Sequence, residues 1–352
     1  MQLLKYLNKI IELKGSDLFL SAGSKPRIKV EGRLEEVEVE TLSAEMVELM
    51  AKEIMSENNW EKFTKELELD FAIEEKGMDA RFRVNVFRQC GAIALVLRKV
   101  PKEIPSLKKL KTPPVLSNLI MKKRGLILMV GGTGSGKSTT LSAMINHRNT
   151  QSRGHILTIE DPIEFIHSDM SCLVNQREIG VDSLSYAAAL KSAMRESPDV
   201  VMVGEIRDRV TMEAVMELCN TGHLVVSTLH SNNANQALDR IVNLFPRGNR
   251  DQVLMDLSLN LVGIISQRLV MGASETRVAA MEILIMTPHI RELVLSGQLT
   301  EIKAAMEGSA QAGMQTFDAA LFSLYSEHLI SLDVALDNAD SRTNLETKIN
   351  FG

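Results

Sequence analysis

One eight-residue string restricts the possible folds of this chain more than any other feature. Residues 131–138 read GGTGSGKS and match the pattern G-x-x-x-x-G-K-[ST]. An apolar run at 126–130 precedes the string, and a helical pattern follows it. A glycine-rich loop between a buried strand and a helix binds phosphate through backbone N–H groups at the helix N-terminus. The string therefore predicts an α/β domain that binds a nucleotide.

Each residue type in this string suits contact with a phosphate chain. Glycines allow close approach and unusual backbone dihedral angles, so that N–H donors can point inward. Lys137 would reach the β- and γ-phosphates of ATP, and the Ser138 hydroxyl would bind Mg²⁺. The flanking segments disfavour the alternative, a glycine-rich turn with a chance lysine. We expect nucleotide contacts from Gly131, Gly132, Thr133, Gly134, Ser135, Gly136, Lys137, Ser138 and Thr139.

Three carboxylates follow the next strand-like segment. Residues 156–165 read ILTIEDPIEF, which places Glu160, Asp161 and Glu164 around a proline. Like charges so close together repel one another, which favours a cation or a polar group among them. Mg²⁺ with an attacking water is one such occupant. An acidic turn on the surface is the alternative.

Two further strand-like segments each end near a polar side chain. Glu205 follows the apolar residues 200–203, and His230 follows residues 224–229. Open α/β sheets bind ligands at the carboxyl ends of their strands. Glu205 is therefore a candidate for a Mg²⁺ contact through water, with an exposed loop carboxylate as the alternative, and His230 for a hydrogen bond to the γ-phosphate. His223 lies on the opposite face of the second strand, so a metal shared by the two histidines is not expected.

The composition favours a soluble protein of two domains. A length of 352 residues exceeds one ordinary core, because domains cluster around roughly 100 to 200 residues. The formal net charge of −5 disfavours a nucleic-acid partner, since no overall positive field would hold a phosphate backbone. The apolar runs fall far short of the ~20 residues that span a bilayer. We therefore expect a cytoplasmic protein without direct membrane insertion, its three cysteines reduced.

The spacing of apolar residues predicts a small α/β domain at the amino-terminal end. Helical spacing at the start gives way to the alternation that is typical of strands. The domain is expected to end near Arg98. The predicted elements are a helix at 2–14, two strands within 27–39 around Gly32, helices within 44–65, and strands at 67–74, 80–88 and 91–98.

Four of the nine prolines define a linker. Pro101, Pro105, Pro113 and Pro114 lie close together, and proline extends neither a helix nor a sheet ladder. Beyond them, strands and helices alternate, which predicts a mostly parallel sheet covered by helices. From about residue 233 the pattern is mainly helical, with one strand-like stretch at 277–286. The predicted domains are 1–99 and 115–352, joined by a linker at 100–114.

Two arginines alternate with apolar residues in the first domain. Arg81 and Arg83 would project from one face of a strand, while Phe82, Val84 and Val86 pack on the other. Such a basic face suits an anion. On the residues alone, solvated surface arginines are the favoured interpretation.

Four motifs in a fixed order resemble a known superfamily. GGTGSGKS, TIEDPIEF, SPDVVMVGEIRD and TGHLVVSTLH are similar to the Walker A, Asp box, Walker B and His box of the secretion and pilus motor ATPases. The resemblance covers nearly the whole chain. Within the superfamily, SDLFLSAG at 16–23 and GMQTFD at 313–318 are similar to the type IV pilus retraction ATPases. The tetracysteine insertion usual in extension and type II secretion ATPases is not found in this sequence.

The resemblance implies a fold, an assembly and site roles. The fold is a PAS-like domain followed by a RecA-like ATPase domain with a helical C-terminal part, assembled as a cytoplasmic homo-hexamer. Glu164 becomes the general base, supported by the two acids before it, and Glu205 the carboxylate associated with Mg²⁺. His230 becomes the nucleotide sensor. Arg81 and Arg83 become candidates for contacting ATP across a subunit interface.

One stretch departs from the principal retraction ATPases. Those proteins carry A-I-R-N-L-[IV], whereas residues 289–294 here read HIRELV. Together with NANQALDRI at 233–241 and VLMDLSLNL at 253–261, this resembles the accessory retraction ATPases. The partners would be the principal retraction ATPase and the inner-membrane pilus platform protein. The alternatives are the principal ATPase itself, a DNA-pumping RecA-like motor, and a non-hydrolytic subunit that binds ATP only to assemble.

Overall fold

A computed structural model describes residues 2–30, 32–74, 80–100, 103–274, 276–309 and 313–351. The chain divides into two compact units, Met1–Glu103 and Ile104–Gly352. The predicted linker at 100–114 includes this division, and its residues 101 and 102 lie outside the described ranges. Across the described ranges, no helix is long and apolar enough to cross a membrane.

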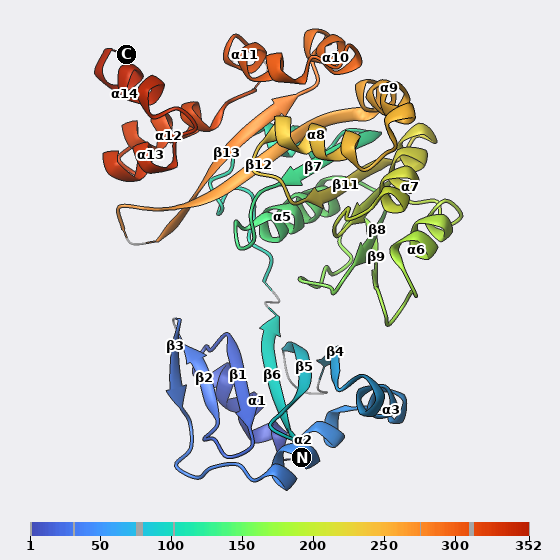
Figure 1. Cartoon of the computed structure of the whole chain (residues 1–352), viewed down its shortest axis with the longest axis vertical. Helices are drawn as coiled ribbons and strands as arrows, with labels where there is room; N and C mark the ends of the chain where they lie inside the picture. The colour runs from blue at the N-terminus through green and yellow to red at the C-terminus, as the bar shows by residue number, and fades with distance from the viewer. Residues whose placement is uncertain are drawn as a thin grey trace. The chain divides into compact units, whose positions relative to one another are not determined.

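The amino-terminal unit is an antiparallel sheet packed with helices (Figure 1). The strand order is β3-β2-β1-β6-β5-β4, and each neighbouring pair runs antiparallel. Leu3, Tyr6 and Leu7 of the first helix join Met50 and Phe63 of the next two in its core. The elements are α1 (Leu3–Glu12), β1 (Asp17–Ser21), β2 (Arg27–Val30), β3 (Arg33–Glu36), α2 (Ala44–Ile54), α3 (Glu57–Glu66), β4 (Glu68–Glu74), β5 (Arg81–Gln89) and β6 (Ala92–Val100).

The alternation predicted for the arginine strand is present in β5. Phe82, Val84 and Val86 are buried in the core of the unit, whereas Arg81 and Arg83 are half-buried on the other face. The predicted strands and helices of this unit are confirmed to within two residues at most ends. The short strand β1 was not predicted, although its residues form part of the sequence resemblance.

The second unit contains a seven-stranded sheet in which all pairs but one are parallel. Its order is β13-β12-β7-β11-β10-β8-β9, and β13 runs antiparallel to β12. This confirms the prediction of a mostly parallel sheet. The strands are β7 (Gly125–Val130), β8 (His155–Glu160), β9 (Leu173–Glu178), β10 (Val200–Val203), β11 (Leu224–Leu229), β12 (Leu261–Met271) and β13 (Arg277–Ile285).

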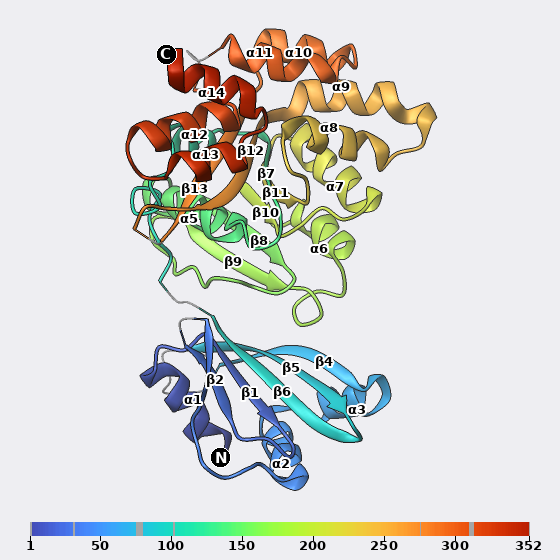
Figure 2. The same cartoon turned by 60° about the vertical axis from the view of Figure 1, so that its left-hand side comes forward.

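Helices cover both faces of this sheet (Figures 1 and 2). One apolar core joins α4 (Val115–Ile120) and α5 (Lys137–Gln151) to one face of the sheet. A second apolar core joins a larger group of helices to the other face of the sheet. A third apolar core forms around the outer ends of β12 and β13. The second set is α6 (Tyr186–Ala193), α7 (Arg209–Asn220), α8 (Ala234–Asn243), α9 (Arg250–Asn260), α10 (Pro288–Leu295) and α11 (Ile302–Glu307); the third is α12 (Phe317–Ser326), α13 (Leu332–Asn338) and α14 (Arg342–Phe351).

The predicted strand at 277–286 is confirmed as β13, but a second strand after residue 233, β12, was not predicted. β12 is an eleven-residue strand that pairs in parallel with β7. Seven of its residues are buried with no regular alternation, because helices cover both faces of the sheet. The strand also follows α9 directly at Leu261, without a glycine or proline to mark the change. Period-two patterning therefore could not reveal it.

Candidate functional site

The glycine-rich loop connects β7 to α5 at the carboxyl end of the parallel strands. Gly131, Gly134 and Gly136 have φ angles of 150°, 74° and 85°, values that side chains disfavour. A Cβ at Gly131 would overlap the backbone oxygen of Gln267 and lie 2.6 Å from Ser135 Oγ. The loop therefore needs glycine both for its dihedral angles and for its close packing on β12.

Lys137 lies folded over this loop. Its Nζ donates hydrogen bonds to the backbone oxygens of Gly131 and Gly132, each at 2.8 Å. Burial lowers the pKa of Lys137 below its ordinary value, while the negative charges of Glu205 and Glu164 oppose the change. The side chain is 8% exposed, so its positive charge lies in a partly dehydrated site where it attracts anions strongly.

A cavity of about 250 Å³ opens beside Lys137. It gathers residues that are far apart in the sequence, because β7, β8, β10 and β11 all end at this edge of the sheet. The predicted site residues on its lining are Thr133, Gly134, Lys137, Ser138, Glu164, Glu205 and His230. Gly131 and Gly132 line an adjacent cavity that also reaches His230, and Gly136 and Thr139 line a third cavity.

Glu205 lies between two cationic or protonatable side chains. Arg207 Nε donates to Glu205 Oε2 at 2.8 Å, and His230 Nε2 lies 3.3 Å from Glu205 Oε1. Arg207 also contacts Asp161 at 3.5 Å. Arg207 was not predicted as a site residue. Its position two residues after Glu205, within the GEIRD string, is the signal that could have identified it.

The three acids of the predicted cluster lie in different environments. Glu160 is 4% exposed, and burial raises its pKa. It accepts hydrogen bonds from Thr158 Oγ1 at 2.7 Å and from the Glu164 backbone N–H at 3.3 Å. Glu160 therefore holds the loop that carries Glu164. Glu164 is exposed, and both Glu164 and Asp161 line the cavity beside Lys137.

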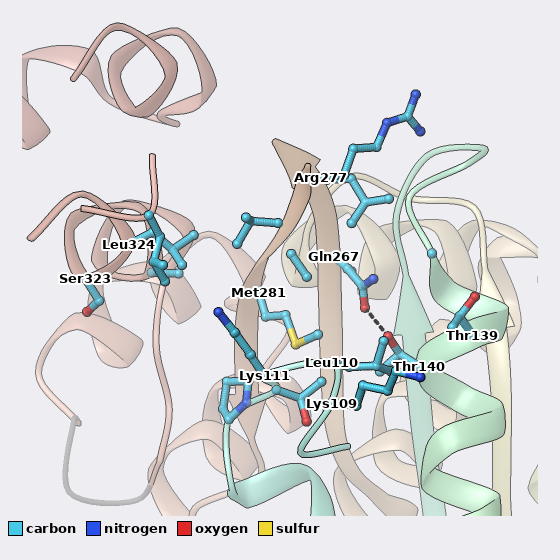
Figure 3. A pocket seen from close by; sticks show the side chains of 18 of the residues that line it. Lys109, Leu110, Lys111, Thr139, Thr140, Gln267, Arg277, Met281, Ser323 and Leu324 are labelled. Carbon is cyan, nitrogen blue, oxygen red and sulfur yellow. Dashed lines mark hydrogen bonds between the residues drawn. The ribbon is translucent and has the colours of Figure 1, made fainter. Parts of the chain in front are cut away.

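A larger cavity lies beside the first turn of α5 (Figure 3). Its volume is about 710 Å³, and it extends from Gly136 and Thr139 to the residues before α4 and the β12–β13 pair. Leu110, Met281 and Leu324 give it apolar walls. Its volume and mixed lining are suited to a flat ring system attached to a phosphate chain. Gln267 lines this cavity and was not predicted.

The remaining predicted residues lie elsewhere. Arg81 and Arg83 lie on β5 in the amino-terminal unit, and the cavities described above belong to the second unit. His223 Nδ1 is 3.1 Å from Thr221 Oγ1 and from the Leu218 oxygen at the end of α7, which is a structural role.

The described residues contain no cluster of three His, Cys, Asp or Glu side chains suited to a metal ion. A divalent cation at this site would then take most of its ligands from phosphate oxygens and water, as Mg²⁺ commonly does. The Ser138 hydroxyl and the Glu205 carboxylate line one cavity, so both are available to such an ion.

Comparison with known proteins gives close relatives over the whole length. The family described as Type II/IV secretion system protein matches residues 2–292. The Type IV pilus ATPase PilU of Pseudomonas aeruginosa is 45% identical over 353 residues, covering 100% of this chain and 92% of the relative. The Type IV pilus retractation ATPase PilT of the same organism is 41% identical, covering 92% of this chain and 94% of the relative.

Solved structures of secretion and pilus ATPases also match this chain over most of its length. The crystal structure of the pilus retraction motor PilT with bound ADP superposes with a TM-score of 0.92 at 40% identity and covers 97% of this chain and 98% of that one. The ATPase DotB of Legionella pneumophila superposes with a TM-score of 0.83 at 29% identity, covering 94% of this chain and 92% of that one.

Proposed function

The chain belongs to the family of type II/IV secretion system proteins, and from this premise we propose that it hydrolyses ATP to power type IV pilus retraction as an accessory motor. The family match and the full-length similarity to pilus ATPases confirm the resemblance found in the four sequence motifs. The chain is an ATPase of this family. The single observation that carries the proposed chemistry is the cavity that joins Lys137, Glu164 and Glu205.

In the proposed reaction, water attacks the γ-phosphate in line with the leaving oxygen. Catalysis comes from positioning and charge neutralisation, without a covalent intermediate. Lys137 holds the β- and γ-phosphates, Glu164 orients the water and accepts its proton, and His230 contacts the γ-phosphate. Ser138, and Glu205 through water, would hold Mg²⁺, which when bound would supply positive charge against the phosphates. The base and ribose occupy the larger cavity beside Thr139.

We further propose a homo-hexamer that works in the cytoplasm at the inner membrane. It attaches there through the principal retraction ATPase and the pilus platform protein. Arg81 and Arg83 contact ATP bound to a neighbouring subunit, as the family resemblance implies. The segment at 100–114 serves as the hinge between the domains at 1–99 and 115–352, so that nucleotide exchange at subunit interfaces moves one domain against the other.

The accessory assignment has two supports. The chain is more similar to the PilU relative than to the PilT relative of one organism, at 45% against 41% identity. The sequence at 289–294 also departs from the principal type at Glu292.

Phosphate release by the purified full chain tests the proposed chemistry. Lys137→Ala should abolish both binding and hydrolysis, because the ammonium that holds the phosphates is lost. Glu164→Gln should still bind ATP but cleave it at least about a hundredfold more slowly, the usual scale for loss of a general base. Equal turnover in wild type and Glu164→Gln would contradict the role of Glu164.

A further inference from the structure

A buried amide lies against the glycine-rich loop. Gln267 is 2% exposed and belongs to β12, the strand that sequence patterning did not reveal. β12 pairs with β7 up to Ser266 and Val130, so Gln267 follows the last paired position where β7 gives way to the loop. A buried amide is costly unless its polar atoms are bonded. The hydrogen-bond partners of the Gln267 amide therefore indicate what this side chain stabilises.

Both ends of the Gln267 amide bond to the phosphate-binding segment. Nε2 donates to the backbone oxygen of Ser135 at 2.7 Å. Oε1 accepts from Thr140 Oγ1 at 2.8 Å, the contact drawn as a dashed line in Figure 3. Ser135 lies within the loop, and Thr140 lies in the first turn of α5. One side chain thus fixes the loop relative to the helix that follows it.

The loop also packs directly on this residue. A Cβ at Gly136 would lie 2.8 Å from Gln267 Nε2, and a Cβ at Gly131 would overlap the Gln267 backbone oxygen. Two of the glycines required by the motif therefore have a second reason to be glycine, namely the close approach of Gln267. Any shift of this residue would be transmitted to the N–H groups that a phosphate chain contacts.

We propose that Gln267 is a positioning residue that sets the shape of the phosphate-binding loop for nucleotide. This inference rests on the proposed ATPase function and adds a residue outside the four motifs. Gln267 acts through the Ser135 carbonyl and the Thr140 hydroxyl. It serves to keep the loop N–H donors directed at the phosphates before the nucleotide arrives, which lowers the ordering cost of binding.

The first test replaces the amide by a side chain of similar length without its hydrogen-bonding groups. Gln267→Met should weaken binding of a fluorescent ADP analogue by at least about tenfold, because the Ser135 carbonyl and the Thr140 hydroxyl lose their partners. The KM for ATP should rise more than kcat falls. Ser266→Ala is the matched control, because it removes a buried hydroxyl at the neighbouring position. That hydroxyl bonds Glu282 rather than the phosphate-binding loop. Ser266→Ala should leave ADP affinity unchanged.

The second test separates positioning from general packing. The carboxyl introduced by Gln267→Glu has the shape of the amide but donates to the Ser135 oxygen only when protonated. Burial raises the pKa of such a group. ADP binding by this variant, relative to wild type, should therefore improve by about tenfold or more as the pH falls from about 8 to about 6. Gln267→Met should show no such recovery.

The outcomes distinguish this inference from the function on which it rests. Wild-type affinity for ADP in Gln267→Met would overturn the role of Gln267 and leave the ATPase assignment intact. A wild-type chain that binds no ADP would refute the ATPase assignment, and the role of Gln267 with it. If Gln267→Met does not fold, the decision passes to Gln267→Glu, where a pH-independent ADP affinity would overturn the inference.

Discussion

Burial controls the charge of individual side chains around the site. Lys137 uses two of its three N–H donors on the loop carbonyls, and burial lowers its pKa. An ammonium held in this way is already aimed at the loop, so phosphate oxygens can replace the carbonyls as acceptors with little reorganisation. The negative charges of Glu205 and Glu164 oppose this lowering of the pKa and favour the charged form of Lys137, which is the form that binds phosphate.

His167 shows the same effect in a residue with no proposed catalytic role. It follows the Asp box segment and is 6% exposed, and its Nδ1 has no hydrogen-bond partner within the described residues. Burial lowers the pKa of His167 from 6.5 to about 4. The folded protein therefore holds this imidazole neutral, while the unfolded chain binds a proton below pH 6.5.

A loss of stability in acid follows from this pKa. Neutral His167 contributes to the free energy of unfolding, and this contribution is fully present above pH 6.5 and declines as the pH falls toward 4. The decline amounts to at most about 3 kcal/mol. Urea unfolding of wild type and His167→Leu at several pH values would measure it. The stability of wild type should fall more steeply than that of the variant over this range. Parallel curves would show that His167 has the same pKa in both states.

The sequence predicted most of the cavity residues that follow a strand, with Arg207 as an exception, and missed Gln267, which depends on packing. Glu205 and His230 come just after apolar strands, and Lys137 follows another such strand across the glycine-rich loop, so their common location follows from the parallel order of the sheet. Gln267 lies 127 residues from its partner Thr140, inside a strand with no alternation. Its contact with the loop exists only in the folded chain, and no local pattern encodes it.

At the level of elements, β12 links the nucleotide site to the C-terminal helices. Gln267 bonds the loop, and the next residue, Arg268, bonds the backbone oxygen of Asn338 at 2.9 Å and Asp340 Oδ1 at 2.8 Å. The Arg268 guanidinium also lies 3.8 Å from the centre of the Phe317 ring. Successive side chains on a strand point to opposite faces. β12 therefore contacts the phosphate-binding loop through Gln267 and the C-terminal helices through Arg268.

We expect Arg268→Ala to loosen the C-terminal helices. The arginine side chain is 28% exposed and that of Asp340 14%, so the loss of its hydrogen bonds and its ring contact should cost about 2 to 3 kcal/mol. Hydrogen exchange should rise in α12, α13 and α14 and remain unchanged in β7. Lys303→Ala is the control, because Lys303 also pairs with Asp340 but is 37% exposed, and it should cost about 1 kcal/mol or less. Similar exchange in both variants would contradict this view of β12.

At the level of the whole molecule, the residues that we propose to act on ATP are divided between the two units of the chain. Lys137 belongs to the second unit, and Arg81 belongs to the first. The fold class and most of the elements could be predicted from the sequence because the periods of helix and strand are local, although β1 and β12 were missed. The arrangement of subunits could not, since it depends on surfaces that meet only after folding.

Mixed assemblies test whether active sites are shared between subunits. Arg81→Ala and Lys137→Ala should each be inactive alone if the arginine acts across an interface. In an equal mixture, about one interface in four would combine an intact Lys137 with an intact Arg81, so part of the activity should return. Each variant must first be shown to assemble. Mixtures of assembled variants that remain inactive would exclude a shared site.

The departure at 289–294 bears on which machine the motor serves. Arg291 donates to the backbone oxygens of Ser258 and Leu259 and so ties α10 to the end of α9. Glu292 is exposed on the same helix, so within the subunit its charge costs little. A partner surface that buried this carboxylate without a cation would cost several kcal/mol, an order of magnitude typical of unpaired buried charge. If a partner does bury α10 at Glu292, its surface must therefore differ from the one that fits the principal type.

This argument predicts the behaviour of two strains. Cells that lack the principal retraction ATPase but express this chain should fail to retract pili, because under this proposal the chain engages the pilus base through the principal ATPase. Cells with a hydrolysis-dead principal ATPase should retract as long as this chain is intact, since it can then supply the energy through the inactive ring. Lys137→Ala in the second strain is the control and should abolish retraction, because both sources of hydrolysis are then gone. Retraction in cells that contain this chain alone would overturn the accessory assignment in favour of the principal type.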